Sequence, residues 1–190
     1  MNIGLFFGSF NPVHTGHLII GNIMAENAGV DQVWFVVSPQ NPFKNNNSLA
    51  HEFDRYDMVR VAIGDDPKLR VSDVEFQMPK PSYTVDTLTY LQAQHPEHVF
   101  SLILGSDNLL HFEKWKNYEQ ILKHFKLLVY QRPGQTDHAL FQHESVKVIE
   151  APLLDISATF IRSMIKDGKS IRYMVPLAVE EFIRDKKLFL

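Results

Sequence analysis

The sequence predicts an α/β fold: a doubly wound, Rossmann-like parallel sheet with helices on both faces, in a single domain with a C-terminal helical segment. Short runs typical of buried strands alternate with helical patterns from one end of the chain to the other. No internal repeat, low-complexity tract or linker divides residues 1–190. Glycine, aspartate and arginine turns follow the strands, so we expect them together along one edge of the sheet.

The N-terminal third of the chain supplies the two most strongly apolar strands. The run 3–7 is apolar at nearly every position, which is typical of a central parallel strand that is buried on both faces. Turn-forming residues follow it, and a helix is expected over 18–28, where Gly29 ends it. The β-branched and aromatic run 33–37 predicts the second strand. Residues 38–48 contain two prolines and four asparagines, which predicts a loop.

The remaining elements alternate in the same way. Apolar residues at helical spacing predict a helix over 52–63, and 69–74 is expected to form a short strand. A further helix follows the sequence Pro-Ser-Tyr-Thr, with Ser82 or Thr84 as its cap. The other expected elements are strands at 100–104, 127–130 and 146–149, and helices through Trp115, over 118–124, from Ser157 to Gly168, and after Pro176.

Composition narrows the class of protein. The chain has a mass of 21.9 kDa, is 45% hydrophobic, carries a net charge of −3 and contains no cysteine, so it offers neither disulfides nor a basic surface for nucleic acid. It shows no signal-peptide pattern and no apolar run of membrane-spanning length. We therefore expect a cytoplasmic protein without nucleic-acid or membrane partners. Its oligomeric state stays open, a homo-oligomer included.

The strongest motif is residues 3–18, IGLFFGSFNPVHTGHL, where a buried strand turns into a helix. It places His14 and His17 at the carboxyl end of the first strand, where ligands bind in open α/β sheets. Backbone N–H groups at a helix start favour an anion, so a phosphate site is one interpretation. A plain strand-to-helix turn is another. Zinc binding by the pair is less favoured, because no third ligand stands at a zinc spacing.

The segment GSFNPVHTGHL resembles the GxFxPxHxGH signature of the nucleotidyltransferase superfamily. Residues 156–162, ISATFIR, resemble the second signature of that superfamily, ISSTxIR. Its members transfer a nucleotidyl group from ATP or CTP to a phosphate. The resemblance implies that His17 contacts the α-phosphate and stabilises the transition state, with His14 beside it. It also implies that the turn after the first strand binds ATP, through Gly8, Ser9 and Phe10.

The second motif is expected at the start of a helix, where hydroxyl and backbone N–H groups can hold the outgoing phosphates. We expect Ser157 and Thr159 to do this, and Arg162 to add positive charge one turn further on. A simple helix cap is the alternative for Ser157. The usual middle serine of the signature is Ala158 here, so any role of that hydroxyl cannot be transferred.

Along nearly its whole length the chain is similar to the bacterial nicotinate-nucleotide adenylyltransferase family. The similar segments are SPQNPFK, PSYTVDTL, GSDNLLHFEKW, QRPG and IRYMVPLAVEEFI. The resemblance implies that Lys44 contacts phosphate and is one of the catalytic residues, although a solvated lysine is the favoured interpretation from composition alone. It also implies that Gly105 and Asp107 face the nucleotide and that Arg132 approaches ATP; Asp107 could instead cap a helix.

The same resemblance implies a site for nicotinate. Trp115 can stack on a flat aromatic ring, and backbone N–H groups near Tyr83 and Thr84 can receive its carboxylate. Core packing is the alternative for Trp115 and Tyr83. The implied reaction joins ATP and nicotinate mononucleotide into nicotinate adenine dinucleotide and pyrophosphate, a late step of NAD biosynthesis. Mg²⁺ would come with ATP, without a metal site built from protein residues.

Two other functions are weighed against this one. The first is pantetheine-phosphate adenylyltransferase, which shares the HxGH turn. The segments PSYTVDTL and GSDNLLHFEKW argue against it. The second is a regulatory nucleotide-binding module without chemistry, which the joint presence of His14, His17, Lys44 and Arg162 disfavours.

Overall fold

A computed structural model describes residues 1–40, 49–132, 138–152 and 155–190. Six parallel strands form one sheet, in the order β3-β2-β1-β4-β5-β6. The strands are β1 Asn2–Gly8, β2 Gln32–Val37, β3 Leu69–Ser72, β4 Val99–Gly105, β5 Lys126–Tyr130 and β6 Val146–Ile149. The strand order reverses between β1 and β4, which is where a doubly wound sheet opens a crevice for ligands. The fold class expected from the sequence is confirmed.

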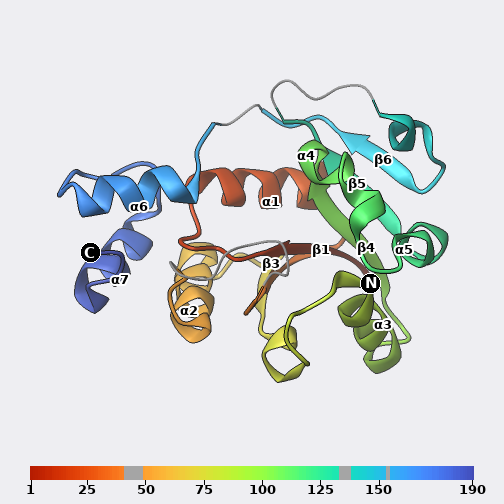
Figure 1. Cartoon of the computed structure of the whole chain (residues 1–190), viewed down its shortest axis with the longest axis horizontal. Coiled ribbons are helices and arrows are strands. Elements are labelled where there is room, and N and C mark those ends of the chain that lie inside the picture. The colour runs from red at the N-terminus through yellow and green to blue at the C-terminus, as the bar shows by residue number, and fades with distance from the viewer. Residues whose placement is uncertain (41–48, 133–137, 153–154) are drawn as a thin grey trace.

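The first five helices lie between strands, and the last two follow β6 (Figure 1). Their bounds are α1 Thr15–Asn27, α2 Glu52–Ile63, α3 Thr84–Gln94, α4 Ser106–Leu109, α5 Tyr118–His124, α6 Ala158–Lys166 and α7 Leu177–Lys186. Short 3₁₀ turns lie at Val74–Gln77, Phe112–Lys114 and Ala139–Gln142. Among these described helices, none is both long and apolar enough to cross a membrane. Figure 1 shows α6 and α7 at the end of the molecule opposite α3 and α5.

Alternation along the strands divides the interior into two cores. In β2, Val33 and Phe35 face one side with residues of α1, α2, α6 and α7, while Trp34 and Val36 face the other side with residues of α3 and α5. Both faces of the central strands are therefore covered, which explains why these strands read as continuous apolar runs. Helix α7 returns to pack on α2, and Lys186 pairs with Asp54 across that contact.

Three local expectations were wrong. The third strand ends at Ser72, because the Ser72 hydroxyl accepts a hydrogen bond from the N–H of Val74 and turns the chain into a 3₁₀ segment. The helix expected through Trp115 is a four-residue helix followed by a 3₁₀ turn. Its apolar positions, Leu109, Phe112 and Trp115, are three residues apart, a spacing that 3₁₀ turns satisfy as well as an α-helix.

The third wrong expectation concerns the cap of α3. Tyr83 is its N-cap residue, without a side-chain hydrogen bond, so neither Ser82 nor Thr84 has that role. The Ser82 backbone N–H instead donates to the carbonyl of Gln40, which ties this turn to the loop after β2. By contrast, the simple cap weighed for Ser157 is present: its hydroxyl accepts a hydrogen bond from Phe160 N–H at 3.2 Å.

Candidate active site

A cavity of about 690 Å³ lies where the strand order reverses, at the carboxyl ends of β1 and β4. This volume suits a small-molecule ligand. The cavity collects side chains from segments that are far apart in the sequence. The site residues predicted from the sequence that line it are Gly8, Ser9, Phe10, His14, His17, Tyr83, Thr84, Gly105, Asp107, Trp115, Arg132, Ser157, Thr159 and Arg162. Lys44, the remaining predicted residue, lies outside the described part of the chain.

The two histidines form a stacked pair at the start of α1. His14 is the N-cap residue and His17 lies one turn further on, with ring centroids 3.6 Å apart. The backbone N–H of His14 donates to Nδ1 of His17 at 3.3 Å. Because Nδ1 accepts this bond, the neutral His17 ring carries its proton on Nε2. The local backbone thus sets which nitrogen of His17 can donate to a ligand.

His14 is an uncharged donor at neutral pH. Its side chain is 6% exposed, and burial, with a smaller contribution from the positive charge of Arg132, lowers its pKa from 6.5 to about 4. Among the described residues, its Nδ1 atom has no hydrogen-bond partner. A buried imidazole nitrogen without a partner is costly, and an anionic ligand would both satisfy it and favour its protonation.

The lowered pKa predicts acid sensitivity of the free protein. A histidine held neutral by the fold contributes fully above its unfolded pKa of 6.5, and that stability is lost as the pH falls toward about 4. Between about pH 7.5 and about pH 5, we expect His14 to account for a loss of about 2 kcal/mol in the free energy of unfolding. Urea unfolding of wild type and of His14→Gln at both pH values measures the contribution of His14 to this loss.

The exposed His111 supplies the matched control for that measurement. His111→Gln should keep the wild-type loss of stability on acidification, whereas His14→Gln should lose less. Equal pH dependence in His14→Gln and wild type would contradict the neutral, buried state of His14.

In the turn after β1, the ring of Phe10 packs tightly over Gly8. Phe10 adopts a positive φ of 46°, which is uncommon for a residue other than glycine, and its side chain is buried. Its ring lies directly over Gly8, where a Cβ atom would come within 2.7 Å of it. Gly8 is therefore required sterically, and the strained turn brings Ser9 and the histidines to the cavity.

The amino ends of α1 and α6 meet at this cavity, as both sequence motifs predict. A Cβ atom at Gly16 would lie 3.8 Å from the Cβ of Ile156, so the two helix starts are separated by about the space of one methyl group. Ser157 and Thr159 line the cavity from α6. Ala158 lines it as well, in place of the serine usual in the motif. Two helix dipoles thus favour an anion in the same place.

Two arginines hold the loops around the cavity. Arg162 donates to the carbonyl of Asn11 at 2.8 Å, which ties α6 to the turn after β1. Arg55 was missed by the sequence reasoning. It is 1% exposed, and its guanidinium donates to the carbonyls of Ser9 and Ser38, each at 2.7 Å.

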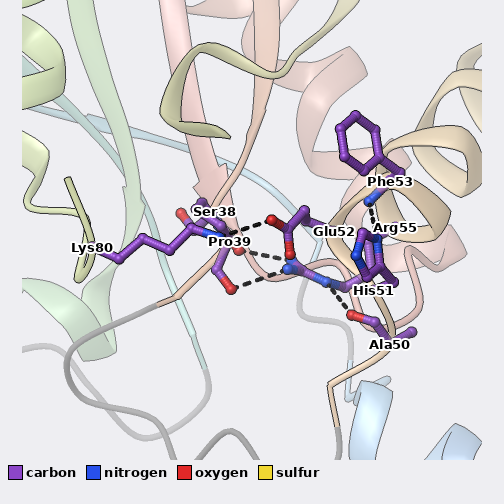
Figure 2. A network of polar contacts seen from close by, with 8 residues as sticks. All are labelled: Ser38, Pro39, Ala50, His51, Glu52, Phe53, Arg55 and Lys80. Carbon is purple, nitrogen blue, oxygen red and sulfur yellow. Dashed lines mark hydrogen bonds and ion pairs between the residues drawn. The ribbon is translucent and has the colours of Figure 1, made fainter. Parts of the chain in front are cut away.

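Figure 2 shows the Arg55 guanidinium among the backbone carbonyls that follow β2. It also donates to Ala50 at 2.9 Å and to Pro39 at 3.2 Å. Arg55 thus joins the segments on either side of residues 41–48 to the turn after β1. Its position in the sequence could have indicated that it is buried, because it lies three and four residues before Met58 and Val59, which are buried on the same helix.

The end of β4 supplies the opposite wall. Arg132 lies beside Asp107, with Nε 3.5 Å from Oδ1, and its backbone N–H donates to the Ser106 hydroxyl at 2.8 Å. A Cβ atom at Gly105 would collide with the Asp107 carboxylate and crowd Arg132, so a larger residue here would displace the Asp107 side chain. The alternative of Asp107 as a helix cap is wrong, because Gly105 is the N-cap residue of α4.

Aromatic and basic groups gather at the start of α3. Trp115 is half-buried and packs on Phe112 with centroids 5.0 Å apart, while it also lines the cavity. Lys116, which the sequence reasoning did not single out, lies 4.6 Å from the centre of the Tyr83 ring and pairs with Asp86. Core packing and ligand stacking are therefore compatible for Trp115, since one face of a large ring can serve each.

A buried acid beneath this pocket was also missed. Glu75 is 1% exposed, accepts a hydrogen bond from the Thr87 hydroxyl at 2.7 Å and lines the cavity near Ser82. Burial raises the pKa of its carboxyl, and hydrogen bonds from Thr87, Ser38 and Ser82 oppose that rise. It directly follows the strand expected over 69–74 and has no motif around it, so nothing in the sequence indicated burial.

Comparison with known proteins decides the family. The family model described as Cytidylyltransferase-like matches residues 5–164. A probable nicotinate-nucleotide adenylyltransferase of Cytophaga hutchinsonii is 60% identical over 189 residues, which cover 100% of this chain and 98% of that protein. The chain belongs to the nicotinate-nucleotide adenylyltransferase family. Another member, from Flavobacterium psychrophilum, is 48% identical over 96% of both chains.

Solved structures agree with the fold of this adenylyltransferase. The nicotinic acid mononucleotide adenylyltransferase of Plasmodium falciparum, complexed with NaAD, superposes with a TM-score of 0.84 at 20% identity, over 99% of this chain and 97% of that one. The same enzyme complexed with APC gives a TM-score of 0.83. The doubly wound architecture is thus shared with solved enzymes even where the sequences have diverged. The resemblance inferred from the motifs is confirmed.

Proposed function

We propose that this cavity joins ATP and nicotinate mononucleotide, giving nicotinate adenine dinucleotide and pyrophosphate. The family of close relatives supports the reaction, and solved neighbours hold NaAD and APC. The observation that carries the assignment to this site is the cavity itself. It has two converging helix starts with a histidine pair on one side, and Trp115 with Tyr83 on the other.

In this reaction a phosphate oxygen of nicotinate mononucleotide forms a bond to the α-phosphorus of ATP, and the bond to the β-phosphate breaks. Little covalent chemistry is required of the protein, so positioning and charge neutralisation carry the rate. His17 would donate from Nε2 to the α-phosphate, and His14 would lie beside it. Ser157, Thr159 and Arg162 would hold the departing pyrophosphate.

The nucleotide and the nicotinate ring would occupy different parts of the cavity. Asp107 and Gly105 would face the nucleotide, with Arg132 approaching ATP. Trp115 would stack on the ring, while the N–H groups at the start of α3, by Tyr83 and Thr84, would receive its carboxylate. Lys44, which the family resemblance assigns to phosphate and to catalysis, stays a prediction, as do the cytoplasmic location and any homo-oligomer.

The donor set bears on how Mg²⁺ would be held. Among the described residues that line the cavity, Glu75 and Asp107 are the carboxylates; Glu75 is buried and hydrogen-bonded to Thr87, and Asp107 pairs with Arg132. This small set of carboxylates fits a Mg²⁺ ion held mainly by nucleotide oxygens. Bound there, the ion would neutralise charge on the phosphates.

The choice between the acid and the amide substrate tests this assignment. We expect kcat/KM for nicotinate mononucleotide to exceed that for nicotinamide mononucleotide by roughly 10- to 100-fold. Hydrogen bonds to a charged group contribute roughly 1.5–3 kcal/mol, and the amide would leave a donor unpaired. Pyrophosphate release with ATP and each mononucleotide measures the ratio.

Phosphopantetheine with ATP is the third arm of the assay. Release of pyrophosphate from ATP with phosphopantetheine, but with neither mononucleotide, would assign the protein to the pantetheine-phosphate adenylyltransferases. Preference for the amide would overturn the role of the α3 start. No release above background with any acceptor would favour a regulatory nucleotide-binding module.

A further inference from the structure

A second group of chemically active side chains lies far from the cavity, in the turn between α3 and β4. His95 is the residue that ends α3, and Glu97 and His98 directly precede β4. The cavity lies at the other end of β4, past Gly105. A strand of that length spans about 20 Å, so this group is separate from the adenylyltransferase site.

Three potential ligand atoms in this turn converge on one point. Nδ1 of His95 lies 3.7 Å from Oε1 of Glu97, and Nδ1 of His98 lies 3.4 Å from the same oxygen. One potential ligand atom from each of the three residues lies within 4.8 Å of those of the other two. Around a tetrahedral Zn²⁺ ion, metal–ligand bonds of about 2.0–2.1 Å place neighbouring ligand atoms about 3.3 Å apart. The turn therefore already approaches that geometry.

These separations are not those of ordinary hydrogen bonds. A hydrogen bond between an imidazole N–H and a carboxylate oxygen has a length of about 2.7–3.2 Å, shorter than either distance from Glu97. Across the described parts of the chain, Nδ1 of His98 has no hydrogen-bond partner, although water does not reach that atom. A buried acceptor of this kind is satisfied when it binds a cation.

The surrounding structure holds the imidazoles in place. The N–H of His98 donates to the carbonyl of His95 at 3.0 Å, and the two rings are nearly parallel, 10° apart. Trp34 packs edge-on against His95, and Phe100 does so against His98. A site fixed by the backbone turn and by neighbouring rings loses little side-chain entropy when it binds an ion.

We propose that His95, Glu97 and His98 form a binding site for one divalent transition-metal ion, with Zn²⁺ as the reference ion and water as the remaining ligand. Two imidazole nitrogens and one carboxylate oxygen suit Zn²⁺, Ni²⁺ and Cu²⁺, whereas Mg²⁺ prefers oxygen ligands and retains its water. The ion would fasten the end of α3 to the start of β4. Its effect is on stability, and the adenylyl transfer does not pass through it.

Titration of the untagged, full-length protein with ZnCl₂ in a calorimeter tests the site. We expect one Zn²⁺ ion per chain at micromolar concentration and a melting temperature that rises with Zn²⁺ but not with Mg²⁺. His95→Ala and His98→Ala should each weaken Zn²⁺ binding at least about 100-fold. Glu97→Gln provides a variant that cannot fail for lack of folding, because its side chain is 61% exposed.

Two controls separate this site from other histidines. His124→Ala removes an exposed histidine of α5 and should leave Zn²⁺ binding unchanged. His17→Ala should also leave it unchanged, which distinguishes the turn from the histidine pair in the cavity. The proposal is overturned if Zn²⁺ does not bind, if Mg²⁺ competes at equal concentration, or if Glu97→Gln and His98→Ala bind Zn²⁺ as wild type does.

Discussion

Replacement of His17 by alanine is expected to lower kcat for adenylyl transfer at least about 100-fold, the loss expected for one positioned donor at a developing charge. The backbone N–H of His14 fixes the tautomer of His17, so that Nε2 carries the proton to be donated. Because this bond to the α-phosphate would strengthen in the transition state, the loss should appear in kcat more than in KM for ATP. Steady-state rates of pyrophosphate release measure both.

A second substitution at the same position separates donation from packing. His17→Asn keeps a side-chain N–H donor and should retain more activity than His17→Ala. If both variants fold, as circular dichroism can report, and both turn over near the wild-type rate, His17 has only a structural role. A loss confined to KM would mean that His17 holds ATP without stabilising the transition state.

Replacement of Arg55 by methionine is expected to lower the free energy of unfolding by at least about 3 kcal/mol. Four backbone carbonyls, those of Ser9, Ser38, Pro39 and Ala50, lose their guanidinium donor. Each buried acceptor left unsatisfied costs about 1–3 kcal/mol, and methionine replaces the packing of the arginine stem but none of its hydrogen bonds. Urea denaturation monitored by tryptophan fluorescence measures the change.

Arg60 offers a matched control on the same helix. It is exposed and pairs with Asp57 alone among the described residues, at 3.1 Å and one turn away. Arg60→Met should change stability by less than about 1 kcal/mol, because exposed ion pairs of this kind contribute little. If Arg55→Met also lowered the free energy of unfolding by less than about 1 kcal/mol, the account of Arg55 as the residue that joins the loops would be contradicted.

Arg55 also has a functional consequence that differs from that of His17. Arg55 is not among the residues that line the cavity, yet it donates to the carbonyls of Ser9 and Ser38, two residues that do. The remaining folded fraction of Arg55→Met should therefore bind ATP more weakly, and a high ATP concentration should restore much of the rate. His17→Ala should show no such recovery. The two variants thus distinguish positioning from participation in the reaction.

The fold and the histidine side of the cavity were largely predictable from the sequence, because their signals are local. Continuous apolar runs such as 33–37 need burial on both faces, so the parallel sheet follows from composition and spacing. A strand, a turn and a helix start in one short stretch likewise place His14 and His17 at the carboxyl edge without any distant contact.

Only the tertiary structure decided which partners the charged residues have. Whether Arg55 meets water or four carbonyls depends on loops that follow two other strands, and the same holds for the buried carboxyl of Glu75. The cluster of His95, Glu97 and His98 appears in the sequence as an ordinary polar turn. Its convergence depends on ring contacts from β2 and β4. Hydrophobic periodicity records which face of an element is buried, but it does not record which groups from other elements a buried polar atom will meet.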